Sequence, residues 1–183
     1  MRFTFTSAVF LLLFGFGIAH AEVQDVSANS LRVRQVQTVS ASPDRVWQSF
    51  LHIERWWSGD HTFSGDAANL RLESKPGGCF CESLPNGGGV LHMSVVYVEP
   101  GKRMTMSGAL GPLQDSGARG ALTFLITARG EASEISLVYN IGGYYPGGLD
   151  SIGGGVDMVL GEQLRRLKRL IETGTAAAKP EPK

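Results

Sequence analysis

The chain has 183 residues, of which 43% are hydrophobic, with 17 basic side chains, 17 acidic side chains and two cysteines. This length suits one domain of ordinary size with enough interior for a core and a cavity. Because the charges balance and no basic cluster stands out, we expect no nucleic-acid partner.

The first 21 residues have the composition of a signal peptide. Arg2 supplies a positive start, and the apolar stretch from Ala8 to Ala19 is shorter than the roughly 20 residues that span a bilayer. An uncleaved anchor is the alternative, but Ala19-His20-Ala21 is typical of a cleavage site. We predict cleavage after Ala21, a periplasmic or secreted protein without a membrane span, and a loose polar lead-in over residues 22–30.

Residues 31–41 are strand-like, with a slip in the alternation near Gln35 that indicates a bulge. Ser42-Pro43-Asp44 then predicts a helix from Pro43, since Ser caps helix starts, Pro is tolerated in the first turn and Asp complements the positive helix end. We expect this helix to run to about Leu51 with Val46, Trp47 and Phe50 buried, and a second short helix to hold Ile53, Trp56 and Trp57. The two adjacent tryptophans should not both face one core, so we expect one to line a cavity and the other to close an edge.

The middle of the chain alternates apolar and polar residues with period two, as half-buried antiparallel strands do. The segments that show it are 70–73, 91–98, 104–107, 122–127 and 134–141. Turn signals such as Pro76-Gly77-Gly78 and Pro100-Gly101 separate them. Links this short predict a meander rather than parallel crossovers.

The last predicted element is an amphipathic helix over about residues 156–172, with Val156, Leu160, Leu164, Leu167 and Ile171 at helical spacing. Gly174 is a plausible C-cap, and residues 174–183 form a tail that we expect to be disordered. The predicted fold is one α+β domain over residues 31–173. A curved antiparallel sheet of about six to seven strands grips one long C-terminal helix, with two short helices after the first strand.

Several segments resemble the START-like (SRPBCC, helix-grip) superfamily, and within it the branch of the activator of the Hsp90 ATPase and the polyketide cyclases. They are Val39-Ser-Ala-Ser-Pro-Asp-Arg-Val-Trp47, the pair Trp56-Trp57, Pro76-Gly77-Gly78-x-Phe80, Val98-Glu99-Pro100-Gly101-Lys102-Arg103 and the closing helix 156–171. The resemblance covers roughly residues 33–172. It implies an apolar ligand held between the sheet and the long helix, in proteins that include cyclases, dehydratases, carriers and co-chaperones. It carries no catalytic residue over to this chain.

Cys79-Phe80-Cys81 is the sharpest local feature. Residues i and i+2 of a strand share a face, with Cα atoms about 6.6 Å apart, at the outer edge of disulfide geometry. A possible disulfide between Cys79 and Cys81, two packed thiols, and a soft-metal site with His92, Met93, Met104 and Met106 all remain open. We predict no metal at this point of the chain.

Two further features could belong to a site. His61 with Asp60 could form an acid–base pair, although a solvated loop histidine is the simpler interpretation. The glycine-rich stretch 142–155 could form a flap that carries Tyr144 and Tyr145. It is not a phosphate loop, because no Lys-Ser/Thr follows its glycines, and we predict no cofactor.

The sequence therefore predicts a periplasmic binding protein for a small apolar molecule held between the sheet and the C-terminal helix. The alternatives are a cyclase-, dehydratase- or hydrolase-type enzyme that uses His61 or His92 in the same cavity, and an envelope interaction protein with a filled core. The expected ligand-binding residues are Trp56, Trp57, Phe63, His92, Met93, Met106, Tyr144, Tyr145 and Leu160.

Overall fold

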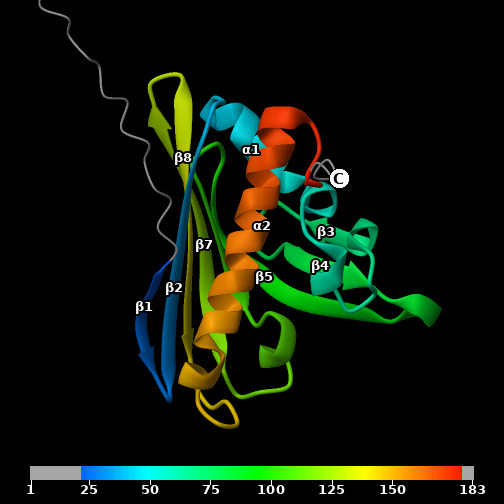
Figure 1. Cartoon of the computed structure of the whole chain (residues 1–183). Coiled ribbons are helices and arrows are strands. Elements are labelled where there is room, and N and C mark those ends of the chain that lie inside the picture. Colours follow the sequence, from blue (N-terminus) through cyan, green and yellow to red (C-terminus); the bar gives the residue numbers. More distant parts are fainter. Residues whose placement is uncertain (1–21, 179–183) are drawn as a thin grey trace, which may run out of the picture.

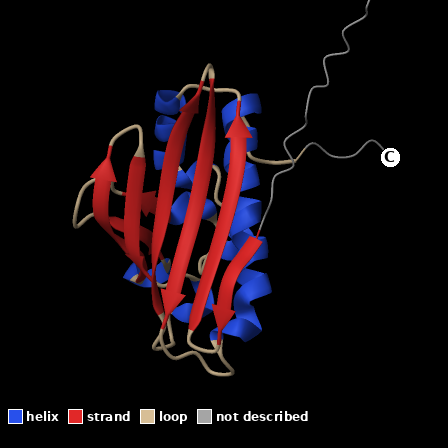
Figure 2. Cartoon of the chain, turned by 90° about the vertical axis from the view of Figure 1, so that its left-hand side faces the viewer, coloured by secondary structure: helices blue, strands red, loops and turns tan. Residues whose placement is uncertain are grey.

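The computed structural model describes residues 22–178. The predicted signal peptide, its cleavage point and residues 179–183 of the predicted tail lie outside the described residues. A single open antiparallel sheet of eight strands forms one layer, and the helices lie together against one of its faces (Figures 1 and 2). Within residues 22–178, no helix combines the length and the apolar character needed to cross a membrane.

The strands follow the order β1-β2-β8-β7-β6-β5-β4-β3 across the sheet, so β2 joins the start of the chain to the final hairpin. Their bounds are β1 (Glu22–Ser27), β2 (Ser30–Val39), β3 (Leu70–Leu72), β4 (Cys79–Ser83), β5 (Gly89–Glu99), β6 (Arg103–Gly108), β7 (Arg119–Arg129) and β8 (Ala132–Gly142). The meander of short links is as predicted, but there are more strands than the six to seven expected.

The additional strand is β1, which replaces the loose lead-in predicted over residues 22–30. It pairs antiparallel with β2 at the edge of the sheet. Its side chains from Gln24 to Ser27 are exposed and Val23 is only half-buried, so the sequence shows no apolar alternation there. Backbone hydrogen bonds hold this strand in place, and composition does not reveal them.

The bulge predicted near Gln35 is absent from the pairing of β2 with β8, which runs without a register shift. Gln35 instead continues the buried face of Leu31 and Val33. Its side-chain nitrogen donates to the Oδ1 atom of Asp157 at 2.6 Å and to the backbone oxygen of Asp157 at 3.2 Å. A polar side chain on the core-facing side of the strand, and not a change of register, therefore interrupts the alternation near Gln35.

The first helix, α1 (Pro43–Leu51), begins and ends where the sequence predicts. Ser42 caps it, with its Oγ atom accepting from the Arg45 backbone nitrogen at 3.4 Å. The predicted stripe of Val46, Trp47 and Phe50 is buried. The second short helix is one 3-10 turn, η1 (Ile53–Arg55), which ends before Trp56. Trp56 and Trp57 are both buried, so the expectation that they cannot both face the core is wrong.

The long helix α2 (Gly153–Thr173) lies across the sheet and starts three residues before the predicted position, with Gly153, Gly154 and Gly155 in its first turn (Figure 1). Gly174 ends it in a left-handed conformation, and the Gly174 backbone nitrogen donates to the Leu170 oxygen at 2.9 Å. The ordered chain continues past residue 173, because Ala176 is buried and its oxygen accepts from Arg169 at 3.0 Å. Ala176, within the predicted tail, therefore packs against the domain.

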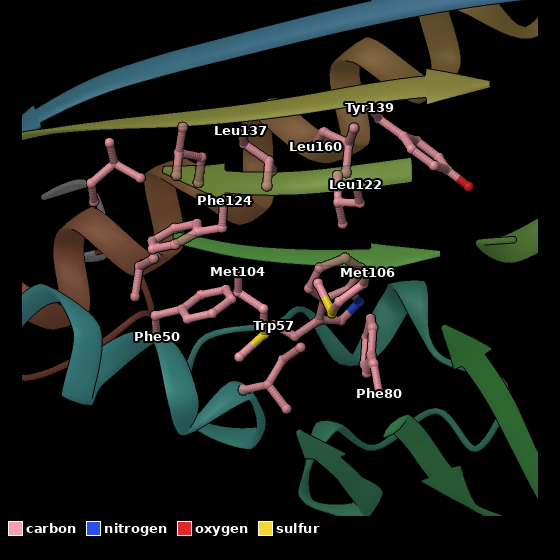
Figure 3. Packing of buried hydrophobic residues seen from close by; sticks show 14 of the residues in the cluster. Phe50, Trp57, Phe80, Met104, Met106, Leu122, Phe124, Leu137, Tyr139 and Leu160 are labelled. Atoms are coloured by element: carbon pink, nitrogen blue, oxygen red, sulfur yellow. The ribbon is translucent and has the colours of Figure 1, made fainter. Parts of the chain in front are cut away.

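Aromatic packing fills the core between α1 and the sheet (Figure 3). The rings of Phe50 and Phe124 stack with centroids 3.8 Å apart, and Trp57 meets the edge of Phe80 at 5.3 Å. Burying each such side chain stabilises the fold by roughly 1.5–3 kcal/mol. This packing ends near Trp57, and beyond it the space under the start of α2 is only partly filled.

Candidate functional site

A cavity of about 640 Å³ lies between the first turns of α2 and the sheet. Its walls come from the loop after α1, strands β5 and β8, the loop that holds the 3-10 turn η5 (Gly111–Leu113), and the region where the turn η6 (Leu149–Ile152) leads into α2. The lining residues are Trp57, Asp60, His61, Thr62, Phe63, His92, Leu110, Gly111, Pro112, Leu113, Asp115, Tyr139, Ser151, Ile152, Gly155, Val156, Met158, Val159 and Leu160.

Most of this wall is apolar, and its charged groups are of one sign. Asp60 and Asp115 contribute carboxylates, whereas no lysine or arginine is among the lining residues. Two large apolar side chains that line the cavity are also exposed, Phe63 by 53% and Met158 by 64%. The cavity therefore suits a neutral, mostly apolar molecule better than an anion, which would find no positive partner in the wall.

A buried histidine–carboxylate pair lies at one part of the wall. The Nε2 atom of His92 lies 3.0 Å from the Oε2 atom of Glu82, and the two residues are only 4% and 2% exposed. Glu82 also accepts from the backbone nitrogen of Phe63 at 3.1 Å and from that of Ser64. His92 lines the cavity while Glu82 stands behind it, so the carboxylate orients the ring from the protein side.

A β-bulge brings His92 into this position. The pairing register of β4 with β5 shifts between Phe80 and Cys81, which leaves His92 as an extra residue on β5. As a result His92 and Met93, although adjacent in the sequence, are both buried. Bulges commonly redirect a side chain next to a functional site in this way.

The environment of this pair keeps Glu82 ionised and His92 neutral. Burial acts to raise the pKa of Glu82, but hydrogen bonds from Ser64, Phe63 and His92 together outweigh it and leave the pKa below its ordinary value. Burial lowers the pKa of His92, and the adjacent Glu82 carboxylate offsets this only in part. The proton of the neutral imidazole then sits on Nε2, which donates to Glu82, and Nδ1 is left as an acceptor.

A second histidine–carboxylate pair lies at a more open part of the cavity. The Nε2 atom of His61 is 3.1 Å from the Oε2 atom of Glu162 on α2, and the two side chains are 29% and 37% exposed. The sequence suggested Asp60 as the partner of His61, but the helix supplies Glu162 instead. This contact links the loop after α1 to α2 at the side of the cavity.

The structure brings four of the nine predicted ligand-binding residues to the cavity wall: Trp57, Phe63, His92 and Leu160. The other five lie elsewhere. Trp56, Met93 and Met106 are buried in the core, Tyr144 is 71% exposed and Tyr145 packs partly against the core. The predicted aromatic flap therefore does not contribute its tyrosines to the wall.

Sequence reasoning missed Glu82 and Tyr139 as site residues. Glu82 follows Phe80 at a spacing of two on β4, so an inward-facing charge in that strand was the available signal. Tyr139 lies in a strand with ordinary alternation, and nothing in that pattern distinguishes it from the side chains that only pack in the core. The loop around η5 had no periodic signal at all.

The two cysteines form a disulfide bond next to this site. Their Cα atoms are 5.4 Å apart, closer than the spacing of a regular strand, and the Nη2 atom of Arg71 lies 3.6 Å from the Cys79 sulfur. A soft-metal site needs free thiolates, which a disulfide does not supply. Among residues 22–178 no group of three histidine, cysteine or acidic side chains is placed to hold a metal ion.

No protein-family model and no curated protein matches this sequence. Solved structures do match in fold. A conserved protein of unknown function from Enterococcus faecalis, EF2215, superposes with a TM-score of 0.60 at 14% identity, over 90% of this chain and 82% of that one. Protein MLL2253 from Mesorhizobium loti gives 0.56 at 20% identity, over 76% of this chain and 96% of that one.

A third similar structure comes from a biosynthetic locus. DynU16, from the dynemicin biosynthetic locus, superposes with a TM-score of 0.56 at 20% identity, over 79% of this chain and 48% of that one. At such identities the likeness concerns the fold alone. The chain shares its α+β fold with uncharacterised proteins and with proteins of biosynthetic loci, which is compatible with the helix-grip resemblance of its sequence.

Proposed function

We propose that this protein binds a small, neutral, mostly apolar molecule in the cavity between α2 and the sheet, as an exported binding protein. The observation that carries the proposal is the cavity itself, whose volume of about 640 Å³ falls within the range of small-molecule sites. A protein with a filled core would offer no such space beside its aromatic packing.

The wall indicates how a ligand would be held. Trp57, Val156 and Leu160 supply apolar contact, and the acceptor nitrogen of His92 offers one directional hydrogen bond. A hydroxyl group on an apolar ring or chain would satisfy that nitrogen. An anionic group would face Asp60 and Asp115 instead, so we expect fatty acids and phosphate esters to bind poorly.

Three matched probes test this preference by calorimetry: naphthol, naphthalene and naphthoate. We expect naphthol to bind most tightly because its hydroxyl can donate to His92, naphthalene to bind about tenfold more weakly, and naphthoate to bind weakest. Native mass spectrometry of protein purified from its own host would identify the natural occupant. Equal affinity for naphthol and naphthoate would contradict the assignment of a neutral ligand.

Two adjacent glycines offer a matched pair of variants for locating the binding. Gly155 lines the cavity and Gly154 does not, and a Cβ atom at either position meets no atom within 4 Å. Gly155→Trp should place an indole in the cavity and weaken naphthol binding at least about tenfold, whereas Gly154→Trp should leave it unchanged. If both variants bind naphthol like the wild type, the ligand does not occupy this cavity.

A further inference from the structure

The cavity wall carries two buried polar groups: one can accept a proton and the other can donate a hydrogen bond. His92 offers a lone pair on Nδ1, and the hydroxyl of Tyr139 lies in the same wall. We propose that His92, oriented by Glu82, is a general base that moves a proton on a neutral apolar carbonyl compound, with Tyr139 donating a hydrogen bond to the carbonyl oxygen. This inference rests on the proposed function, since the compound must first bind in the cavity.

The orientation of His92 is fixed on three sides. Nε2 is held by Glu82, the Phe80 ring lies 4.7 Å from the imidazole centroid and the Phe63 ring lies 5.9 Å from it. Among residues 22–178, no protein group forms a hydrogen bond with Nδ1 of His92. Nδ1 is also not completely buried, so a bound molecule can reach it. A base held by a carboxylate behind it, with its free nitrogen toward a hollow, is the arrangement that general-base catalysis needs.

Tyr139 reaches the cavity because a glycine on the neighbouring strand makes room for it. A Cβ atom at Gly120 would lie 2.5 Å from the Tyr139 ring, so only glycine allows the ring to cross β7. The Tyr139 hydroxyl then donates to the Gly108 oxygen at 3.4 Å, a long bond that a better acceptor could replace.

The tyrosine hydroxyl and the histidine are brought near each other by strand pairing. Gly108 pairs with Met93, the residue after His92, and the Ala109 backbone nitrogen donates to the His92 oxygen at 3.0 Å. Burial raises the pKa of Tyr139, which keeps its hydroxyl protonated as a donor. His92, which can accept a C–H proton, and Tyr139, which can donate to a carbonyl oxygen, thus lie in one apolar wall. Figure 3 shows Tyr139 near Leu160 and Leu122.

The proposed step balances without any co-reactant. Nδ1 of His92 takes a proton from the carbon next to the carbonyl group, the C–H electron pair forms a C=C bond, and the C=O π pair moves to oxygen. Tyr139 donates a hydrogen bond to that oxygen, and the Glu82 carboxylate stabilises the imidazolium. Return of the proton from His92 to another carbon of the conjugated system gives an isomer of the starting compound.

A nitrobenzisoxazole is the probe for this base, because removal of its ring C–H proton breaks the N–O bond and releases a coloured phenolate. We expect saturable ring opening by the full chain and a roughly 100-fold loss in kcat for His92→Ala. Tyr139→Phe should lower kcat about tenfold, since the developing phenolate loses its donor. Added imidazole should restore part of the activity of His92→Ala, which a folding defect would not allow.

His52→Ala is the matched control, because His52 also contacts a glutamate, Glu54 at 3.2 Å, but lies outside the cavity. Its kcat should equal that of the wild type. Loss of activity in His61→Ala with retention in His92→Ala would overturn the assignment, and so would wild-type kcat in His92→Ala. If the probe quenches the tryptophan fluorescence of the protein yet no ring opening occurs, this inference fails while the proposed function stands. If neither naphthol nor the probe binds, the proposed function fails as well.

Discussion

The carboxylate of Glu82 decides which nitrogen of His92 carries the proton. Its oxygens are occupied by the backbone nitrogens of Phe63 and Ser64 and by Nε2 of His92. Three donors around one buried carboxylate explain why a charge is tolerated almost out of contact with water.

Replacing this carboxylate by an amide should reverse the tautomer of His92. In Glu82→Gln, we expect the single side-chain oxygen to stay with the Ser64 backbone nitrogen, which makes the shorter of the two backbone contacts. The amide NH₂ group then takes the position of Oε2, gives up the hydrogen bond from Phe63, and faces Nε2 of His92, which favours a proton on Nδ1. Nitrogen NMR of the imidazole should show protonated Nε2 in the wild type and protonated Nδ1 in the variant. A wild-type histidine already protonated on Nδ1 would contradict the proposed base.

Acid should destabilise the fold through the same pair of residues. The folded pKa of His92 lies below its ordinary value of 6.5, so in the range just below 6.5 the unfolded chain binds more protons and stability falls as pH falls. The folded pKa of Glu82 is also lowered, from 4.5, so its contribution is present above that value and is lost as pH falls below it.

Urea unfolding at a series of pH values measures this effect. We expect the free energy of unfolding to decrease from about pH 7 to about pH 5 in the wild type, and the slope to flatten in His92→Gln. Asp60, His61 and Asp115 also face the cavity and are the same in both proteins, so the difference between the two slopes isolates His92 and its contact with Glu82. Identical slopes would contradict a buried neutral histidine.

At the scale of elements, the start of α1 is fixed by one side chain. Ser42 accepts from the Arg45 backbone nitrogen, and Pro43 follows in the first turn. Ser42→Ala should lower the free energy of unfolding by about 1 kcal/mol, because that backbone nitrogen loses its partner. Ser40→Ala is the control, since its side chain precedes the helix and caps nothing; an equal loss in both variants would argue against the cap.

The bulge at His92 and the disulfide opposite it belong to one irregular stretch of the β4–β5 pair. The bridge spans only two residues, so the loop entropy it removes from the unfolded chain is small. We expect the double variant Cys79→Ser and Cys81→Ser to lower the free energy of unfolding by about 1.5 kcal/mol. Chemical reduction of the wild type should cost about the same, and a loss of several kcal/mol would show that the bridge holds the strand register itself.

Elements with a strong local signal were predicted well. The Ser-Pro-Asp start of α1, the alternation of β5 to β8 and the apolar spacing of α2 each appear close to their expected bounds. Elements held by backbone pairing alone, such as β1, left no pattern in the composition. Gln35 shows the opposite failure, because a buried polar contact disturbed an otherwise regular alternation.

For the molecule as a whole, the sequence indicated the space between the sheet and the long helix, but it did not indicate most of the residues that line the cavity there. Of the residues expected to surround a ligand between sheet and helix, Trp57, His92 and Leu160 lie in one cavity wall. The spacing from Phe80 marks Glu82 as an inward-facing charge, but its contact with His92 depends on a bulge, and the position of Tyr139 depends on a glycine in the neighbouring strand. Only the packed sheet reveals these two features. The absence of lysine and arginine from the lining residues likewise emerges only when distant segments meet.

The central claim is that a small apolar molecule sits between α2 and the sheet with a polar group toward His92. A crystal structure of the protein soaked with naphthol tests it most directly. The account predicts density for the ring against Trp57 and Leu160, with the naphthol oxygen within hydrogen-bonding distance of Nδ1 of His92. Density found only at another surface, or side chains meeting throughout the space under α2, would contradict it.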